Sequence, residues 1–97
     1  MPAMSASDIL DQHAASRRLA VVPAYNERAT VAQVVRDLRR EAPGFDILVI
    51  DDGSTDETAS VSRAAGARVL RMPFNLGIGG AVQAGFTFAQ EHGYDLM

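Results

Sequence analysis

The sequence has no cysteine, which excludes a disulfide framework and any metal site built on thiolates. It also has no apolar run close to the roughly 18 residues that a membrane-spanning helix requires. The first 16 residues lack the basic start and apolar core of a signal peptide. An excess of positive charge is missing as well. The net charge is -3 and the pI about 5.2, which argues against a protein that binds nucleic acid. These features are compatible with a cytoplasmic location.

Length and composition indicate one small globular domain. The chain has 97 residues, of which 47% are hydrophobic and 22% charged, close to the averages of globular proteins. Residues 1–18 are polar and rich in alanine and serine, and we expect a loosely attached arm there. We expect residues 19–97 to form the domain.

The stretch most informative about function is an apolar run that stops abruptly at two acids. Residues 47–50 are all branched and apolar, and Asp51, Asp52 and Gly53 follow directly. Such a run is typical of a strand buried on both faces in a parallel sheet. The acids then lie at its carboxyl end, which is the edge where ligands bind in open α/β sheets.

Strands and helices alternate along the chain. Strands are predicted at residues 19–23, 47–50 and 67–72, helices at 30–40, 54–65 and 79–92, and the start of a fourth strand at 94–97. This order predicts right-handed crossovers and a parallel sheet with helices on both faces.

Two helix starts match the capping-box pattern, Thr30 with Gln33 and Ser54 with Glu57. Each helix also has an apolar or small-residue face that should pack on the sheet. The predicted inner faces are Val31, Val34, Val35 and Leu38 in the first helix, Val61, Ala64 and Ala65 in the second, and Ile78, Ala81, Val82, Gly85, Phe88 and Ala89 in the third.

The two acids allow three interpretations. Asp51 and Asp52 suit a hard cation, they suit a ligand that donates hydrogen bonds, and they suit the capping of the helix that follows. Because neighbouring residues of a strand point to opposite faces, at most one of the two is expected to face a ligand.

A second candidate is the glycine-rich segment at the start of the third helix. Gly77, Gly79 and Gly80 lie where a helix N-terminus could bind an anion, although the same glycines also suit a plain tight turn. Val82 replaces the third glycine of the dinucleotide-binding pattern. Tyr25, in the first loop, suits either base stacking or simple packing. His13 and His92 are not expected to be catalytic.

Three segments together resemble the beginning of the family 2 inverting glycosyltransferases, which have the GT-A fold. They are residues 21–27, 49–56 and 75–81. Their spacing, and the approach to the last strand at 93–95, are most similar to the branch that includes dolichol-phosphate mannose synthase and bacterial polyprenyl-phosphate glycosyltransferases. The resemblance covers residues 19–97. It implies a three-layer, Rossmann-like α/β fold with a mainly parallel sheet, interrupted in or after its fourth strand.

The resemblance also implies which residues bind a nucleotide sugar. Residues 23–25 would line the nucleoside pocket, and Glu27 would lie near the phosphates. Asp52 would accept a hydrogen bond from a ring N–H of uracil or guanine, and residues 75–80 would close over the ribose and diphosphate. The binding residues implied in this way are Pro23, Ala24, Tyr25, Glu27, Asp52, Asn75, Gly77, Gly79 and Gly80.

Family members displace a nucleoside diphosphate at the sugar's anomeric carbon, with Mg²⁺ or Mn²⁺ holding the leaving group. The acids that hold the cation should follow the fourth strand, beyond Met97, so the resemblance implies no catalytic or metal-ligating residue within this chain. We therefore expect the 97-residue chain to be inactive alone. The implied partners are a UDP- or GDP-sugar and, in a full-length protein, a polyprenyl phosphate or glycan acceptor of cell-wall or polysaccharide biosynthesis. The resemblance implies that a full-length enzyme would be cytoplasmic, and it allows a location at the inner face of the membrane.

Two rival functions remain at this point. The first is a non-catalytic interaction module with a vestigial nucleotide pocket. The second, a dinucleotide-binding oxidoreductase, is disfavoured by Val82 and by the missing motif at the first strand-helix turn. Because a chain ending at Met97 would leave a strand edge and apolar helix faces uncovered, we also predict a homo-oligomer.

Overall fold

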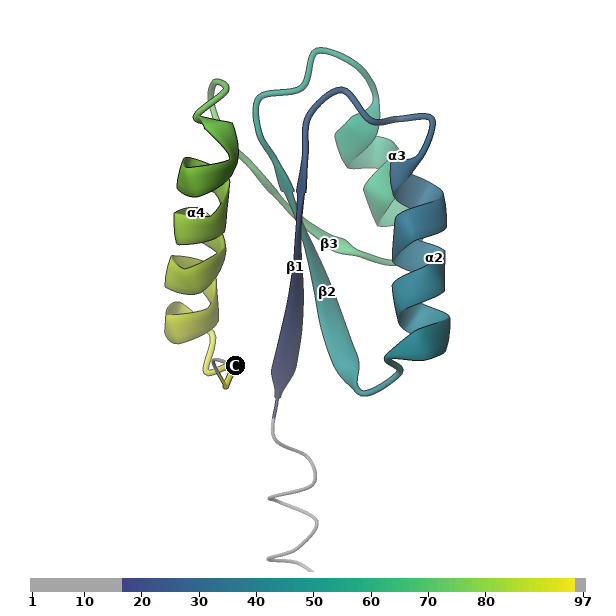
Figure 1. Ribbon diagram of the computed structural model, residues 1–97, viewed down its shortest axis with the longest axis vertical. Coiled ribbons are helices and arrows are strands. Elements are labelled where there is room, and N and C mark those ends of the chain that lie inside the picture. The colour runs from purple at the N-terminus through teal and green to yellow at the C-terminus, as the bar shows by residue number, and fades with distance from the viewer. Residues whose placement is uncertain (1–16, 96–97) are drawn as a thin grey trace, which may run out of the picture.

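The computed structural model describes residues 17–95 and contains three strands and three helices in alternation (Figure 1). The elements are β1 (Arg18–Ala24), α2 (Val31–Glu41), β2 (Phe45–Asp51), α3 (Thr58–Ala64), β3 (Arg68–Arg71) and α4 (Gly77–Glu91). The predicted order of elements is confirmed. The predicted arm, up to residue 16, and the last two residues of the predicted fourth strand lie outside the described residues.

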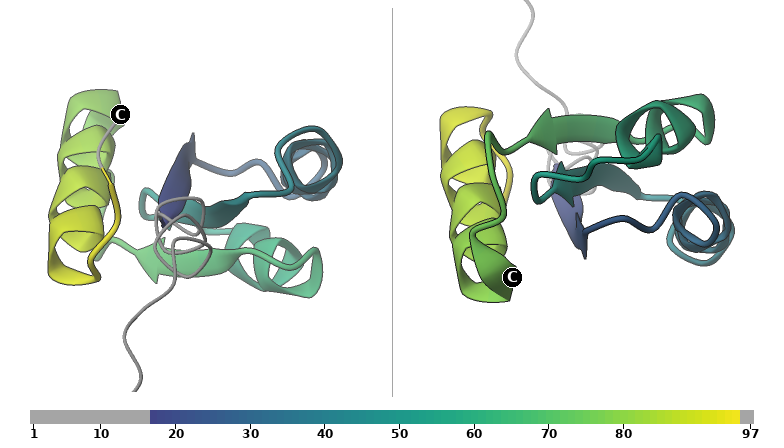
Figure 2. Two further views of the ribbon diagram at one scale, coloured as in Figure 1. Left: turned by 90° about the horizontal axis from the view of Figure 1, so that it is seen from below. Right: turned by 90° about the horizontal axis from the view of Figure 1, so that it is seen from above.

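The three strands form a parallel sheet in the order β1-β2-β3, so β2 is the central strand. Helices α2 and α3 cover one face and α4 covers the other, which gives three layers (Figures 1 and 2). Asp95 forms a parallel bridge with Arg18, and its N–H donates to the Arg17 carbonyl at 2.8 Å. The chain therefore returns to the free side of β1 after α4, which makes β1 the point where the direction of winding reverses.

Alternate residues of the strands build two separate cores. Ile47 and Val49 pack with Val31 and Val35 of α2 on one face of the sheet. On the other face, Leu48 and Ile50 pack with α4. Residues 47–50 are 0–5% exposed, which confirms a central strand buried on both faces.

The capping-box predictions are wrong for both helices. Thr30 precedes α2 but makes no side-chain cap, and the Gln33 amide donates to Asp37 at 2.7 Å. Helix α3 begins at Thr58, four residues after Ser54. The Ser54 hydroxyl instead accepts a hydrogen bond from the backbone N–H of Asn26. The Thr30 hydroxyl donates to the Glu27 carbonyl of its own loop, whereas the Ser54 hydroxyl bonds to a different loop, which a local pattern cannot reveal.

The predicted inner faces of the helices are correct in part. The exceptions, all exposed, are Val34, Ala64, Ile78 and Val82. Helix α3 instead buries Thr58, Ala59 and Ser62. The hydroxyl groups of Thr58 and Ser62 can be buried because both have hydrogen-bond partners. Ser62 donates to the Thr58 carbonyl, and the Thr58 hydroxyl accepts the N–H of Glu27 in the neighbouring loop.

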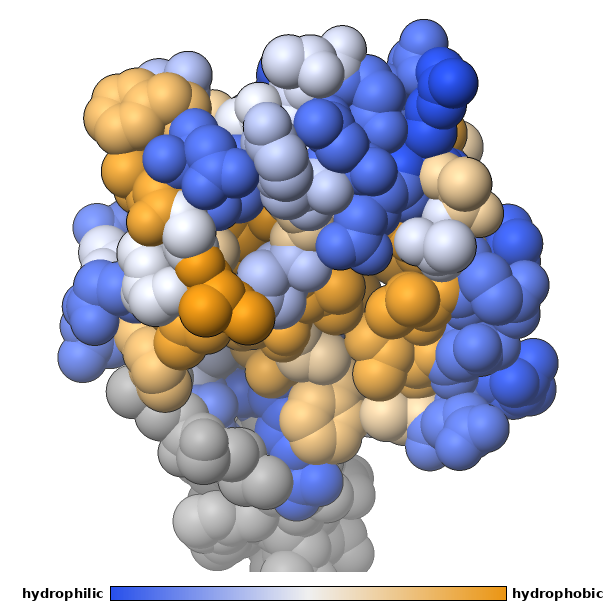
Figure 3. Space-filling model, turned by 45° about the horizontal axis from the view of Figure 1, so that its top comes forward, coloured by the Kyte–Doolittle hydropathy of each residue, from blue (hydrophilic) through white to orange (hydrophobic). Residues whose placement is uncertain are grey.

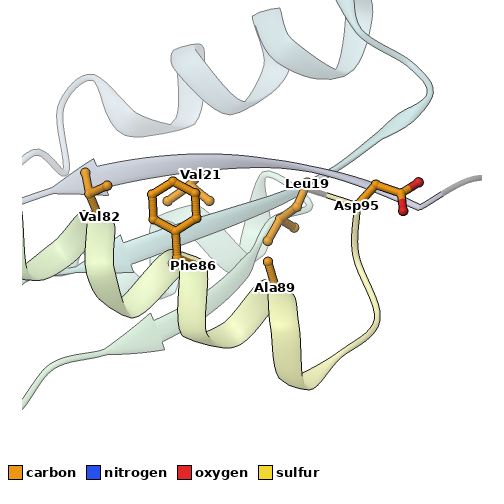
Figure 4. A pocket seen from close by; sticks show the side chains of 7 residues that line it. Leu19, Val21, Val82, Phe86, Ala89 and Asp95 are labelled. Carbon is orange, nitrogen blue, oxygen red and sulfur yellow. The ribbon is translucent and has the colours of Figure 1, made fainter. Parts of the chain in front are cut away.

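An apolar groove of about 250 Å³ runs along the free side of β1 (Figure 4). Leu19 and Val21 of β1 face Val82, Phe86 and Ala89 of α4 there. Helix and strand approach closely at Gly85, where a Cβ atom would lie 2.6 Å from a methyl group of Val21. Among the helices of residues 17–95, none combines the length and the hydrophobicity needed to span a membrane.

Candidate functional site

The loops that follow the three strands lie together at the carboxyl edge of the sheet (Figure 1). There they line an open pocket of about 220 Å³. Ile78 and Ala81 of α4 contribute to its wall. The pocket adjoins β1, where the winding of the sheet reverses. Seven of the nine residues singled out from the sequence line it: Pro23, Ala24, Tyr25, Glu27, Asp52, Asn75 and Gly77.

The remaining two glycines do not line this pocket. Gly79 and Gly80 are in the first turn of α4, and a Cβ at Gly80 would lie 2.7 Å from the Leu76 side chain. His92 lies at the other end of α4, where its ring stacks on Phe88. His13 lies outside the described residues.

Asp52 joins two of the loops. Its two carboxylate oxygens accept the backbone N–H groups of Leu76 at 2.8 Å and Gly77 at 2.9 Å, at the start of α4. The residue is 5% exposed. A carboxylate at a helix N-terminus satisfies free donors and is stabilised by the helix dipole. Asp52 thus caps a helix that begins 25 positions later, not the following helix that its sequence position suggested.

Asp51 faces the opposite side of the sheet from Asp52, as strand alternation predicts. It is fully buried, and its Oδ1 accepts the N–H of Ser54 at 2.9 Å. Its Oδ2 lies 3.4 Å from the Nε of Arg71, its cross-strand partner on β3. Asp51 is therefore a structural residue that orders the turn after β2.

Asn26 links the first loop to the second, a role that the sequence did not suggest. Its φ of 50° is in the left-handed region. Its N–H donates to the Ser54 hydroxyl, and its Oδ1 accepts the N–H of Thr55, both at 2.8 Å. The N–H of Glu27 likewise donates to Thr58 Oγ1 at 2.9 Å. These bonds hold the backbone of the pocket wall from behind.

A charged cluster closes the outer end of the same junction. Arg28 Nη1 lies 2.7 Å from Glu57 Oε2, and the Arg28 N–H donates to Asp56. The hydrogen bond from Arg28 lowers the pKa of Glu57 and raises that of Arg28. The pKa of Asp56 is lowered chiefly because the Thr58 hydroxyl donates to its carboxylate.

Gly53 permits the second and third loops to touch. Its φ is +78°, and a Cβ atom there would lie 2.6 Å from the carbonyl carbon of Phe74. Any side chain would therefore push the third loop away. The glycine of the Asp-Asp-Gly motif is thus required by backbone packing.

Acidic groups dominate this edge of the sheet. Two arginines, Arg28 and Arg71, lie among the strand-end loops, against five carboxylates, those of Glu27, Asp51, Asp52, Asp56 and Glu57. No three histidine, aspartate or glutamate side chains within residues 17–95 gather closely enough to hold a metal ion. The described residues therefore do not fit a complete cation site.

Figure 3 shows hydrophilic surface over the loops near α2 and α3, and hydrophobic surface towards α4.

A comparison with protein families identifies the group to which the chain is related. The model of the family described as Glycosyl transferase family 2 matches residues 19–92, a stretch that contains every strand-end loop and all nine of the residues discussed above. The chain belongs to glycosyl transferase family 2. The family resemblance drawn from the loops is therefore confirmed.

Two curated glycosyltransferases illustrate the relationship. The chain is 38% identical to the undecaprenyl-phosphate mannosyltransferase of Micrococcus luteus over 86 residues, which are 84% of this chain and 35% of that protein. It is 31% identical to the polyprenol monophosphomannose synthase of Mycolicibacterium smegmatis over 87 residues, 84% of this chain and 33% of that protein. The chain thus spans about a third of the length of each of these relatives.

Solved structures of glycosyltransferases have the same fold. The glucosyl-3-phosphoglycerate synthase of Mycobacterium tuberculosis superimposes with a TM-score of 0.67 at 28% identity, covering 91% of this chain and 35% of that one. That enzyme has also been solved with Mn²⁺, uridine-diphosphate-glucose and phosphoglyceric acid. The predicted GT-A class of α/β fold, with its parallel sheet, is confirmed by this match.

Proposed function

We propose that the pocket at the carboxyl edge binds the nucleoside diphosphate part of a UDP- or GDP-sugar. The observation that supports this proposal is that seven of the nine residues implied by the family resemblance, from three loops, line one pocket. Tyr25 is 45% exposed at its rim and presents a ring on which a base can stack. Each carboxylate oxygen of Asp52 accepts one hydrogen bond from the backbone at the start of α4. Each oxygen can therefore accept a further hydrogen bond from a base.

For the complete protein we propose sugar transfer to a polyprenyl phosphate or glycan acceptor. Two relatives with 31–38% identity carry polyprenol or undecaprenyl phosphate in their names. A diphosphate brought to the acidic edge would meet excess negative charge, which a divalent cation relieves. Since residues 17–95 do not form a cation site, we propose that its ligands belong to parts of the protein that follow Met97, and that the chain alone does not transfer sugar.

Isothermal titration calorimetry with UDP- and GDP-sugars, with and without Mn²⁺, tests nucleotide binding. We expect the Tyr25→Ala variant to bind roughly tenfold more weakly, because stacking on an aromatic side chain contributes about 1–3 kcal/mol per base. Phe74→Ala is the matched control, since Phe74 is an exposed loop aromatic that does not line the pocket. Absence of binding at millimolar nucleotide would contradict the proposal.

The rival proposal, a non-catalytic module with a vestigial pocket, is favoured by the capping role of Asp52, which explains that acid without a ligand. The same titration separates the two functions. A vestigial pocket predicts that no nucleotide binds and that Tyr25→Ala and Phe74→Ala behave alike.

A further inference from the structure

A second polar hollow lies at the opposite, amino edge of the sheet and has no part in the proposed function. Its volume is about 480 Å³, and three arginines line it, Arg17 before β1, Arg39 in α2 and Arg68 in β3. Phe45, Asp46 and Tyr94 also line it. We call it the arginine hollow. The chain has no lysine, so all nine of its basic residues are arginines, and a third of them line this hollow although the net charge is -3.

Two of the three arginines have an evident structural role. Helices α2, α3 and α4 all run antiparallel to the strands, so their carboxyl ends point towards this edge on the two faces of the sheet (Figure 1), and their last carbonyl groups carry partial negative charge. Arg17 Nη1 donates to the His92 carbonyl at 2.8 Å after α4, and Arg39 Nη1 donates to the Ala65 carbonyl at 3.1 Å after α3. Each guanidinium has five donors, so both keep donors for another acceptor.

Arg68 has no such role. Its guanidinium lies 5.1 Å from the centre of the Phe88 ring, and within residues 17–95 it makes no hydrogen bond or ion pair. Stacking on an aromatic ring orients a guanidinium while leaving its edge donors available. Arg39 is also held in place, since it packs on Gly66, whose Cβ position would overlap its guanidinium.

The hollow contains a single carboxylate. Asp46 Oδ2 lies 3.9 Å from Arg17 Nη2 and accepts a hydrogen bond from the Tyr94 hydroxyl at 2.5 Å. Arg39 and Arg68 have no carboxylate partner among the described residues. Positive charge therefore exceeds negative charge in the hollow. The hydrogen-bond donors that remain are guanidinium N–H groups, whose planar geometry allows paired hydrogen bonds to phosphate oxygens.

We propose that the arginine hollow binds a phosphate group, carried either by a soluble phosphomonoester or by a lipid headgroup. Arg68, whose guanidinium has no other polar partner among the described residues, supplies the principal contact, and Arg39 and Arg17 line the same hollow. This site lies at the end of the strands opposite the pocket proposed for the nucleotide, so the two can be occupied independently.

Nuclear magnetic resonance titration with inorganic phosphate, at ionic strength held constant with NaCl, tests the site in the full 97-residue chain. We expect shifts of the Arg68 and Arg39 side-chain N–H signals. The Arg68→Gln variant should bind phosphate roughly threefold to fivefold more weakly, the range for one partly exposed ion pair. Asp46→Asn should bind more tightly, because it removes the opposing charge but keeps an acceptor for Tyr94.

Arg63→Gln is the matched control, because Arg63 is exposed on α3 and lies outside the hollow. An equal loss of affinity in Arg63→Gln and Arg68→Gln would overturn the proposal, because it would indicate attraction to net charge alone. Absence of shifts, or shifts confined to the strand-end loops, would also overturn it. Thermal unfolding of each variant checks that its fold is retained.

Co-sedimentation with vesicles distinguishes the two sources of phosphate. Binding to phosphatidic acid vesicles that is lost in Arg68→Gln and absent with phosphatidylcholine vesicles supports a lipid headgroup. Phosphate binding in solution without any binding to vesicles supports a soluble phosphomonoester.

Discussion

Single residues in this chain hold together loops that are distant in sequence. Asp52 is the clearest case, since its acceptor role involves N–H groups 24 and 25 positions further along. Its sequence position, directly after a buried strand, correctly placed it at the carboxyl edge of the sheet. Its partners could not be predicted, because no local pattern relates a carboxylate to a helix that begins 25 positions later.

The Asp52→Ala substitution should lower the free energy of unfolding by about 2–3 kcal/mol, because it leaves two backbone donors without a charged acceptor. Urea unfolding followed by circular dichroism measures the change. Asp37→Ala, which removes a surface carboxylate from α2, should cost less than about 1 kcal/mol. Equal losses in the two variants would refute the capping role. Because of this effect, Asp52 is a poor residue for testing nucleotide binding.

Among the elements, the strands were predicted more accurately than the helix starts. Residues 47–50 are all apolar because the strand is buried on both faces of the sheet. A continuous apolar run in the sequence therefore predicts this strand directly. Ser54 and Thr58 have more than one possible partner, and both bond to the loop after β1 instead of capping a helix locally. Hydroxyl groups at junctions between elements are thus where sequence patterns fail.

The junction between the first two loops should make stability depend on pH in the acidic range. The pKa values of Asp56 and Glu57 are lowered from their usual 3.8 and 4.5, by Thr58 and Arg28 respectively. A carboxylate with a lowered pKa stabilises the fold above its usual pKa, and this contribution disappears as pH falls through the lowered value. The raised pKa of Arg28 affects stability only under strongly alkaline conditions.

We therefore expect the free energy of unfolding to decrease as pH falls from about 5 towards 2. Urea unfolding at several pH values measures this slope. The Asp56→Asn and Glu57→Gln variants should show a shallower slope, whereas Glu91→Gln, on α4 far from this junction, should behave as the parent chain does. A slope unchanged in the two junction variants would contradict the assignment.

At the scale of the whole molecule, the two edges of the sheet differ in charge and the free side of β1 is apolar. Ile78, Val82 and Phe86 repeat every four residues along α4 and are 75%, 39% and 45% exposed. The groove beside them continues onto Leu19 and Val21 of β1. An exposed apolar strip next to an open strand edge favours association.

The homo-oligomer predicted from the sequence stays a prediction, and the structure suggests a surface for it. Sedimentation velocity at tens of micromolar should show a dimer or larger species for the 97-residue chain. Phe86→Glu should shift the distribution towards monomer, because it introduces a charge into the apolar groove. Gln90→Glu adds the same charge to an exposed position of α4 outside the groove and should leave the distribution unchanged. A monomeric parent chain would refute the prediction.

The bonds made by Asn26 have a consequence for how the pocket forms during folding. Its partners, Ser54 and Thr55, are 28 and 29 positions away, so these bonds require the loop after β1 to lie beside the loop after β2, where the pairing of the two strands places it. A slip of one residue in that pairing would turn alternate side chains to the wrong face and separate the loops. A chain with its helices formed but these strands wrongly paired would lack the pocket. Under the proposed function, loss of nucleotide binding in a variant would therefore first indicate a change in the β1–β2 register.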